Sequence, residues 1–181
     1  MPPPLRRAAA LDVTCRPLAE PDLAFIAALY ASTRAEEVAS TGWPAEFQCA
    51  FLAQQHQAQH NHYQAHYPDA EWLVIEAGGE AIGRLYLDER AEDLHLIDIS
   101  LVPERRGGGI GTAIMADLLD WAGARGKTMT LFVEPPNPAR RLYERLGFTA
   151  EGEQGVYEMM IWRPEPAHAG SLPHPDASQD P

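Results

Sequence analysis

Residues 94–124 constrain the fold more than any other part of the chain, because the character of the sequence changes twice within them. Residues 94–102 form an apolar, β-branched run of strand length, and Pro103 ends it. Two arginines and four glycines follow within 105–111, and from Thr112 the apolar positions repeat with helical spacing. The first amides of a helix lack partners, and glycines let a ligand approach the backbone. This order therefore predicts a turn that binds phosphate or pyrophosphate.

The chain has 181 residues, which suits one domain with a substantial core. Cys15 and Cys49 have neither metal-type spacing nor the pattern of a disulfide framework, which favours a reducing cytoplasm. No apolar run approaches the roughly 20 residues of a membrane helix. The first residues also lack the apolar stretch of a signal peptide. We therefore expect a cytoplasmic protein without a membrane partner.

The net charge of −12 is unevenly distributed. Residues 11–104 carry 16 Asp and Glu against four Arg, whereas residues 105–163 are close to neutral. Nucleic acid is not an expected partner, because nucleic-acid binding needs a basic face. An acidic half beside an arginine-bearing half suits a cationic partner and an anionic cofactor, and it equally suits a plain solvated surface.

Apolar spacing and turn residues predict a single α/β (α+β) domain with a mixed sheet. Helices are expected at 20–31, 45–67, 112–124 and 138–146. Strands are expected at 11–16, 72–77, 81–87, 94–102 and 127–133 and as a closing pair within 148–162. A polar loop is expected at 32–42. We divide the chain into a flexible N-terminus (1–10), one folded domain (11–163) and a disordered Pro-rich tail (164–181).

Two short motifs lie on these elements in a characteristic order. The run Arg106–Gly111 fits a pattern of Arg or Gln, two residues, Gly, one residue, and Gly or Ala. Asn137, Leu142-Tyr143 and Gly147-Phe148 follow on the short helix after the next strand. Over residues 11–163 the chain thereby resembles the GCN5-related N-acetyltransferase (GNAT) family. Dinucleotide-binding turns and Walker loops do not fit, because both require a different glycine spacing.

The resemblance implies a GNAT fold with a mixed central sheet of about seven strands flanked by about four helices. The strand before the glycine turn and the next strand would splay apart to admit coenzyme A. The implied cofactor is acetyl-CoA, with no metal. Amides of the turn would hold its pyrophosphate, the strand before the turn would bind the pantetheine arm, and the Ile99 amide would face the thioester carbonyl. The cofactor-binding residues implied are Ile99, Leu101, Arg106, Gly107, Gly108, Gly109, Gly111, Thr112, Asn137 and Tyr143.

Three residues are candidates for catalysis. By the resemblance Tyr143 is the general acid, because acyl transfer leaves a thiolate that a nearby phenol protonates. For the base that takes a proton from an amine, His95 has a suitable ordinary pKa, and Asp98 is a carboxylate inside an apolar strand. A water chain is the third option. Each residue also has a plain structural interpretation. Tyr143 would be a core tyrosine, His95 an exposed histidine at the end of a strand, and Asp98 a structural carboxylate whose hydrogen bonds are satisfied. Asn137 is equally well a helix cap.

The activity implied is direct transfer of an acetyl group from acetyl-CoA to a primary amine in a ternary complex. The acceptor is a small molecule, a peptide or a protein, and the acidic half favours a cationic one. Its candidate contacts are Glu36, Glu37, Trp43 and Tyr86.

The alternatives to this enzyme are a non-catalytic acyl-CoA-binding module and a toxin that acetylates aminoacyl-tRNA, which would need a basic patch. Histidine pairs at 56–66 lack a third ligand, so no metal site is expected. The sequence is compatible with a homodimer.

Overall fold

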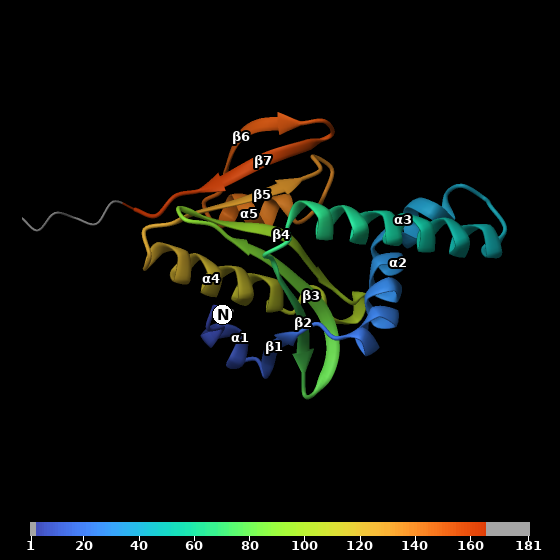
Figure 1. The fold of residues 1–181 in the computed structure, drawn as a ribbon, viewed down its shortest axis with the longest axis horizontal. Coiled ribbons are helices and arrows are strands. Elements are labelled where there is room, and N and C mark those ends of the chain that lie inside the picture. Colours follow the sequence, from blue (N-terminus) through green and yellow to red (C-terminus); the bar gives the residue numbers. More distant parts are fainter. Residues whose placement is uncertain (1–2, 166–181) are drawn as a thin grey trace, which may run out of the picture.

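The computed structural model describes residues 3–165, which form a seven-stranded sheet flanked by five α-helices (Figure 1). The elements are α1 (Arg6–Ala9), β1 (Val13–Pro17), α2 (Leu23–Ala39), α3 (Ala45–His66), β2 (Glu71–Ala77), β3 (Glu80–Glu89), β4 (Asp93–Leu101), α4 (Ile110–Gly123), β5 (Thr128–Val133), α5 (Arg140–Arg145), β6 (Thr149–Gln154) and β7 (Tyr157–Trp162). Single 3-10 turns at Glu20–Asp22 and Pro103–Arg105 precede α2 and follow β4. Nearly all of the predicted tail, from residue 166 on, lies outside the described residues.

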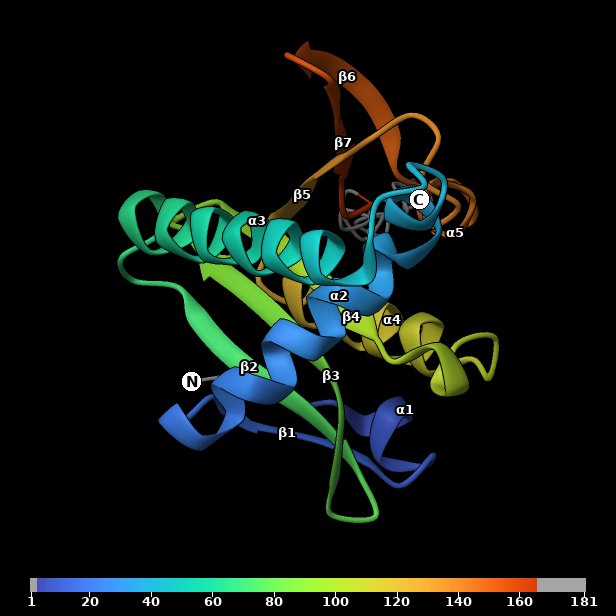
Figure 2. The same cartoon turned by 90° about the vertical axis from the view of Figure 1, so that its right-hand side faces the viewer.

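The sheet confirms the predicted mixed α/β architecture. Its strand order is β1-β2-β3-β4-β5-β7-β6, and every neighbouring pair is antiparallel except β4 and β5. Alternating side chains divide between two helical layers, as strand geometry requires. Leu85 and Leu87 of β3 face the core under α1, α4 and α5, whereas Tyr86 packs against Tyr63 of α3 on the other face. Figure 2 shows α2 and α3 together on that second face.

Within the segment 1–10, for which we predicted flexibility, residues 6–9 form α1 against α4. The backbone N–H groups of Arg7 and Ala8 donate to the carboxylate of Asp117 on α4, at 2.8 and 3.1 Å. Asp117 is buried, and a buried carboxylate needs hydrogen-bond donors. The partners are more than 100 residues apart in the sequence, so local composition did not reveal this contact.

Helix α2 also continues beyond the prediction, through residues 32–39, where we expected a polar loop. The hydroxyls of Ser32 and Thr33 each donate to the carbonyl three residues earlier, at 2.7 Å. Polar side chains that bond back to their own helix do not have to end it. Glu36 and Glu37 therefore lie on a helix rather than in a loop.

Strands β4 and β5 are paired over only part of their length. Their parallel pairing runs from Asp93 opposite Thr128 to Leu96 opposite Leu131, and β4 continues alone to Leu101. The register with β3 shifts at the same place and leaves Ile97 as an extra residue on β4. Such a bulge bends its strand and increases the local twist. The bulge thus explains the separation of β4 from β5, which the family resemblance implied.

On its other edge the same part of β4 lies very close to β3. A Cβ atom at Gly83 would be 2.3 Å from the carbonyl oxygen of Ser100, so no larger residue fits there without displacing β4. The Val102 N–H donates to the Ile82 carbonyl at 2.9 Å, just beyond the end of β4. The free portion of β4 is therefore held from one side and open on the other.

Candidate active site

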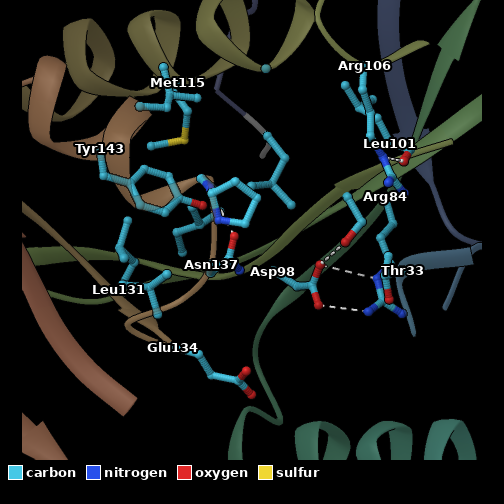
Figure 3. Close-up of a pocket in the computed structure, with 18 of the residues that line it drawn as sticks. Thr33, Arg84, Asp98, Leu101, Arg106, Met115, Leu131, Glu134, Asn137 and Tyr143 are labelled. Carbon is cyan, nitrogen blue, oxygen red and sulfur yellow. Dashed lines mark hydrogen bonds and ion pairs between the residues drawn. The ribbon is translucent and has the colours of Figure 1, made fainter. Parts of the chain in front are cut away.

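A cavity of about 950 Å³ lies between the separated ends of β4 and β5 (Figure 3). Residues of α2, α3, β3, α4, α5 and β7 complete its wall. It brings together most of the predicted site residues, namely Asp98, Ile99, Leu101, Arg106, Gly107, Gly109, Gly111, Thr112, Asn137 and Tyr143. The predicted residues that do not line it are His95, Gly108, Glu36, Glu37, Trp43 and Tyr86.

The backbone of β4 presents unpaired groups to this cavity. The Val102 N–H points toward β3, and successive residues of a strand alternate in direction. The N–H and C=O groups of Ile99 and Leu101 therefore face away from β3, toward the gap that β5 has left. The Leu101 carbonyl already accepts a hydrogen bond from Arg106 Nε at 2.8 Å. The Ile99 amide is thus aimed where an extended ligand would lie.

The glycine turn provides the second donor surface. Gly107 and Gly109 have φ angles of 74° and 82°, which residues with a Cβ rarely adopt. An added Cβ would meet nothing within 4 Å at either position, so open space lies before the turn. No side chain of residues 3–165 caps α4, and its first amides remain free to bind an anion. Arg106 braces the turn by bonding back to Leu101.

Tyr143 of α5 lies at the inner end of the cavity. Its side chain is 7% exposed, packs against Phe148 and points its hydroxyl toward the middle of the cavity (Figure 3). Burial, with a smaller contribution from the nearby Asp98 carboxylate, raises the pKa of Tyr143. The hydroxyl makes no hydrogen bond to another residue of the described chain. A protonated phenol without an internal partner is suited to donate to a ligand.

Asn137 lies at the start of the segment that leads into α5. Its Oδ1 accepts a hydrogen bond from the Ala139 N–H at 2.9 Å, which is the geometry of a cap. The turn that this contact stabilises precedes α5, whose own N-cap residue is Ala139. Asn137 also lines the cavity, and its amide nitrogen makes no bond to another described residue. The same side chain therefore shapes the wall and keeps a donor available.

Asp98 is part of a buried network on β3 and β4. The Arg84 guanidinium donates to its carboxylate through Nη2 at 2.7 Å and Nε at 3.3 Å, and Ser100 Oγ donates at 2.8 Å. Arg84 Nη2 also donates to Gln59 of α3 at 3.0 Å. The side chain of Arg84 is 3% exposed and that of Asp98 12%. Three hydrogen bonds occupy the Asp98 carboxylate and leave room for about one more.

His95 lies outside the cavity, buried between β5 and the segment after α3. Thr130 Oγ1 donates to Asp93 at 2.6 Å, so it must accept from the His95 Nδ1–H at 2.9 Å. His95 Nε2 then accepts from the Tyr67 hydroxyl at 3.4 Å. This network holds a neutral ring, and burial lowers the pKa of His95 to about 4. The geometry favours a structural role for His95. Its side chain is buried, whereas the structural interpretation drawn from the sequence placed it at an exposed strand end.

This burial predicts an acid-induced loss of stability. Between its ordinary pKa near 6.5 and about 4, His95 takes up a proton only in the unfolded chain. The free energy of unfolding should therefore fall as pH decreases through this window, by about 2–3 kcal/mol at pH 4.5. Urea titrations at pH 7 and 4.5 should show a smaller difference for His95→Gln. The exposed His62→Gln is the matched control and should keep the full pH dependence; an unchanged difference in His95→Gln would exclude His95 as its source.

The remaining wall of the cavity, our candidate acceptor side, is lined by Tyr30, Thr33, Arg34, Gln59, Tyr63, Arg84, Glu134 and Tyr157. The predicted acceptor contacts Glu36, Glu37, Trp43 and Tyr86 do not line the cavity. Two of the predicted residues, Glu37 and Tyr86, contact arginines of this wall without lining the cavity themselves. Glu37 pairs with Arg34 at 2.9 Å, and the Tyr86 ring lies 5.2 Å from the Arg84 guanidinium. Tyr30, Thr33 and Arg34 share one face of α2 because they are three and four residues apart. The predicted helix ended before residue 34, so the sequence did not group them.

The histidines of α3 do not form a metal site with other described residues. No group of three or more His, Cys, Asp and Glu side chains in residues 3–165 is placed to hold a metal ion. His62 and His66 stack on α3 with ring centroids 3.9 Å apart, without a third ligand. No helix among these residues is both long and apolar enough to cross a membrane.

Comparisons with known proteins identify this arrangement. The family model of the acetyltransferase (GNAT) family matches residues 33–148. Similar solved structures include the PaiA N-acetyltransferase of Thermoplasma acidophilum in complex with coenzyme A (18% identity, 83% of this chain and 98% of that chain, TM-score 0.61). Others are an acetyltransferase of Thermus thermophilus (18%, 84% and 97%, 0.60) and the ribosomal-protein-S18-alanine N-acetyltransferase of Escherichia coli (18%, 88% and 99%, 0.54). At these identities the structures show a shared fold, and the family model shows that the chain belongs to the GNAT family of acetyltransferases.

Proposed function

We propose that the protein is an acetyl-CoA-dependent N-acetyltransferase that acts on a primary amine. The observation that carries this proposal is the cavity itself. It joins an uncapped helix N-terminus, the open backbone edge of β4 and the hydroxyl of Tyr143 in one continuous space. The coenzyme A bound to the similar Thermoplasma acidophilum acetyltransferase supports the choice of cofactor.

The residues present fit acetyl-CoA. The open space before Gly107 and Gly109, with the free amides of residues 110–112, suits a pyrophosphate, and Arg105 and Arg145 add positive charge to the same wall. Ile99 and Leu101 would bind the pantetheine arm as a strand would, because their backbone groups face the gap. Acetyl-CoA, when bound there, supplies the acetyl group as a thioester.

The chemistry assigned to the protein is proton transfer and orientation. An alkylamine is protonated at neutral pH and must lose a proton before its nitrogen bonds to the acetyl carbon. Tyr143 would donate its proton to the sulfur as the carbon–sulfur bond breaks, and it would regain a proton from water. The Ile99 N–H would donate to the acetyl oxygen. Asp98 orients the ammonium through its remaining acceptor position, and water carries away the amine proton.

Two measurements test this function. A saturating ligand that binds only the folded state must stabilise it, by about 2.7 kcal/mol at 100 times its dissociation constant. Acetyl-CoA should therefore raise the melting temperature, and an amine panel should contain acceptors that release free thiol. Stabilisation without thiol release from any amine would indicate a non-catalytic acyl-CoA-binding module. Absence of stabilisation at saturating acetyl-CoA would refute the cofactor assignment.

A further inference from the structure

The charges that line the cavity are the reverse of those of the whole chain. The net charge of the protein is −12, yet five arginines and only two carboxylates line the cavity. Arg105, Arg106 and Arg145 lie at the proposed phosphate end, where the cofactor carries negative charge. The acceptor side retains two cations and two anions, which are Arg34, Arg84, Asp98 and Glu134. The excess of acid in residues 11–104 therefore does not describe the acceptor site.

Both acceptor-side carboxylates already have an arginine partner. Arg84 and Asp98 are 2.7 Å apart and almost completely buried, so this inner pair is fixed. A purely cationic acceptor, such as a diamine, would meet a carboxylate whose charge is balanced and an arginine that repels it. Burying such a charge without an uncompensated anion is unfavourable. The inner pair thus disfavours an acceptor that carries only positive charge.

The inner pair still offers one acceptor position, on Asp98. The hydrogen bonds of Arg84 to Asp98 and Gln59 use Nε and Nη2, and the Tyr86 hydroxyl lies against the same guanidinium, so the protein itself occupies Arg84. Asp98 keeps about one acceptor position beside Tyr143. An ammonium bound to Asp98 would lie next to the proposed proton donor, and an anionic group of the same molecule would lie toward the arginines.

The outer pair is loose enough to be opened by a ligand. Arg34 Nη2 of α2 and Glu134 Oε1, just after β5, are 3.6 Å apart, which exceeds a hydrogen bond. Their side chains are 34% and 33% exposed, unlike the buried inner pair. Arg34 also holds Glu37 at 2.9 Å, so its guanidinium stays in place if Glu134 turns away. A carboxylate could replace Glu134 on Arg34 with little loss.

We propose that the acetyl acceptor is an amino acid or a similar small molecule that bears a carboxylate beside its amine. Its ammonium binds Asp98, and its carboxylate binds Arg34. A zwitterion satisfies one position of each sign and leaves the charge of the site balanced. This inference rests on the proposed function and narrows it from amines in general to zwitterionic amines.

The first test compares matched acceptors by free-thiol release. The panel contains α-amino acids, their carboxamides, the decarboxylated amines of the same skeletons, short peptides and a diamine. We expect kcat/KM for the best amino acid to exceed that of its carboxamide and decarboxylated amine by about 10- to 100-fold, because a charge-assisted hydrogen bond is lost in each. A preference for the diamine, the decarboxylated amine or a peptide would overturn the proposal.

The second test removes the protein partner of the carboxylate. Arg34→Gln should raise KM for the amino acid about 10- to 100-fold and barely change KM for its carboxamide, so the two losses should not add. Arg34→Lys should recover part of the preference. Arg163→Gln removes an exposed arginine paired with Glu151 far from the cavity, and it should behave as wild type.

The outcomes separate this inference from the function on which it rests. Retained stabilisation by acetyl-CoA will show that each variant is folded. An unchanged preference in folded Arg34→Gln would overturn the zwitterion assignment and leave the acetyltransferase intact. Stabilisation by acetyl-CoA with no acetylation of any amine would instead overturn the proposed function, and the assignment with it.

Discussion

Replacing Tyr143 with phenylalanine is expected to lower kcat by about 100-fold or more while leaving the binding of acetyl-CoA intact. The substitution removes only a hydroxyl that makes no hydrogen bond to another described residue, so folding has little to lose. The ring keeps its packing against Phe148. The leaving sulfur would lose its proton donor, which is a contribution to the transition state rather than to binding.

The measurement is kcat and KM with the best amine, alongside the melting temperature with and without acetyl-CoA. Tyr67→Phe is the matched control, since its hydroxyl lies outside the cavity and its hydrogen-bond partner is His95. We expect that control to keep kcat within a few-fold. A Tyr143→Phe variant with wild-type kcat would show that water or another group protonates the sulfur.

The glycine-turn side of the cavity was predictable because its determinants are local. A glycine turn between a strand and a helix sets its own backbone geometry, so the positive φ at Gly107 and Gly109 follows from a few adjacent residues. Tyr143 and Asn137 could be predicted to lie near each other for the same reason, because they belong to one short segment of the chain. The mixed sheet also followed from local apolar spacing and turn residues.

The candidate acceptor side was not predictable because its residues meet only through the tertiary fold. These residues come from three elements that are far apart in the sequence, with Tyr30 and Arg34 on α2, Gln59 on α3 and Arg84 on β3. Each alone resembles an ordinary surface or core residue. The bulge at Ile97 is also invisible locally, although it decides which groups of β4 face the cavity. Net charge has the same weakness as a guide to the cavity, since it does not record which side chains point inward.

His95 illustrates how burial changes a residue's role. Its ordinary pKa made it a reasonable base from the sequence. The neighbours that determine its state are Thr130 on β5 and Tyr67 after α3, and neither is adjacent in the chain. Together they hold a neutral ring away from the cavity. The carboxylate of β4 that does line the cavity is Asp98, which is held in an ion pair with Arg84.

Asp98→Ala is expected to destabilise the protein by about 3–5 kcal/mol, because it leaves the more buried partner of the pair without its counter-ion. Arg84 is 3% exposed and would retain only Gln59 as a hydrogen-bond acceptor among the contacts described above. Arg84→Met should cost less, since Asp98 lines the cavity, keeps Ser100 and is reachable by water. Chemical denaturation of both variants at pH 7 measures this asymmetry.

The double variant Arg84→Met/Asp98→Leu then separates structure from chemistry. Replacing a buried ion pair with apolar side chains is often neutral or stabilising, so we expect stability within about 1 kcal/mol of wild type and a large coupling energy in the double-mutant cycle. Its acetyl transfer should nevertheless stay low, because no carboxylate remains beside Tyr143 to orient the amine. A stable double variant with wild-type activity would mean that Asp98 serves the fold alone. Equal losses in the two single variants would mean instead that both charges are equally cut off from the cavity.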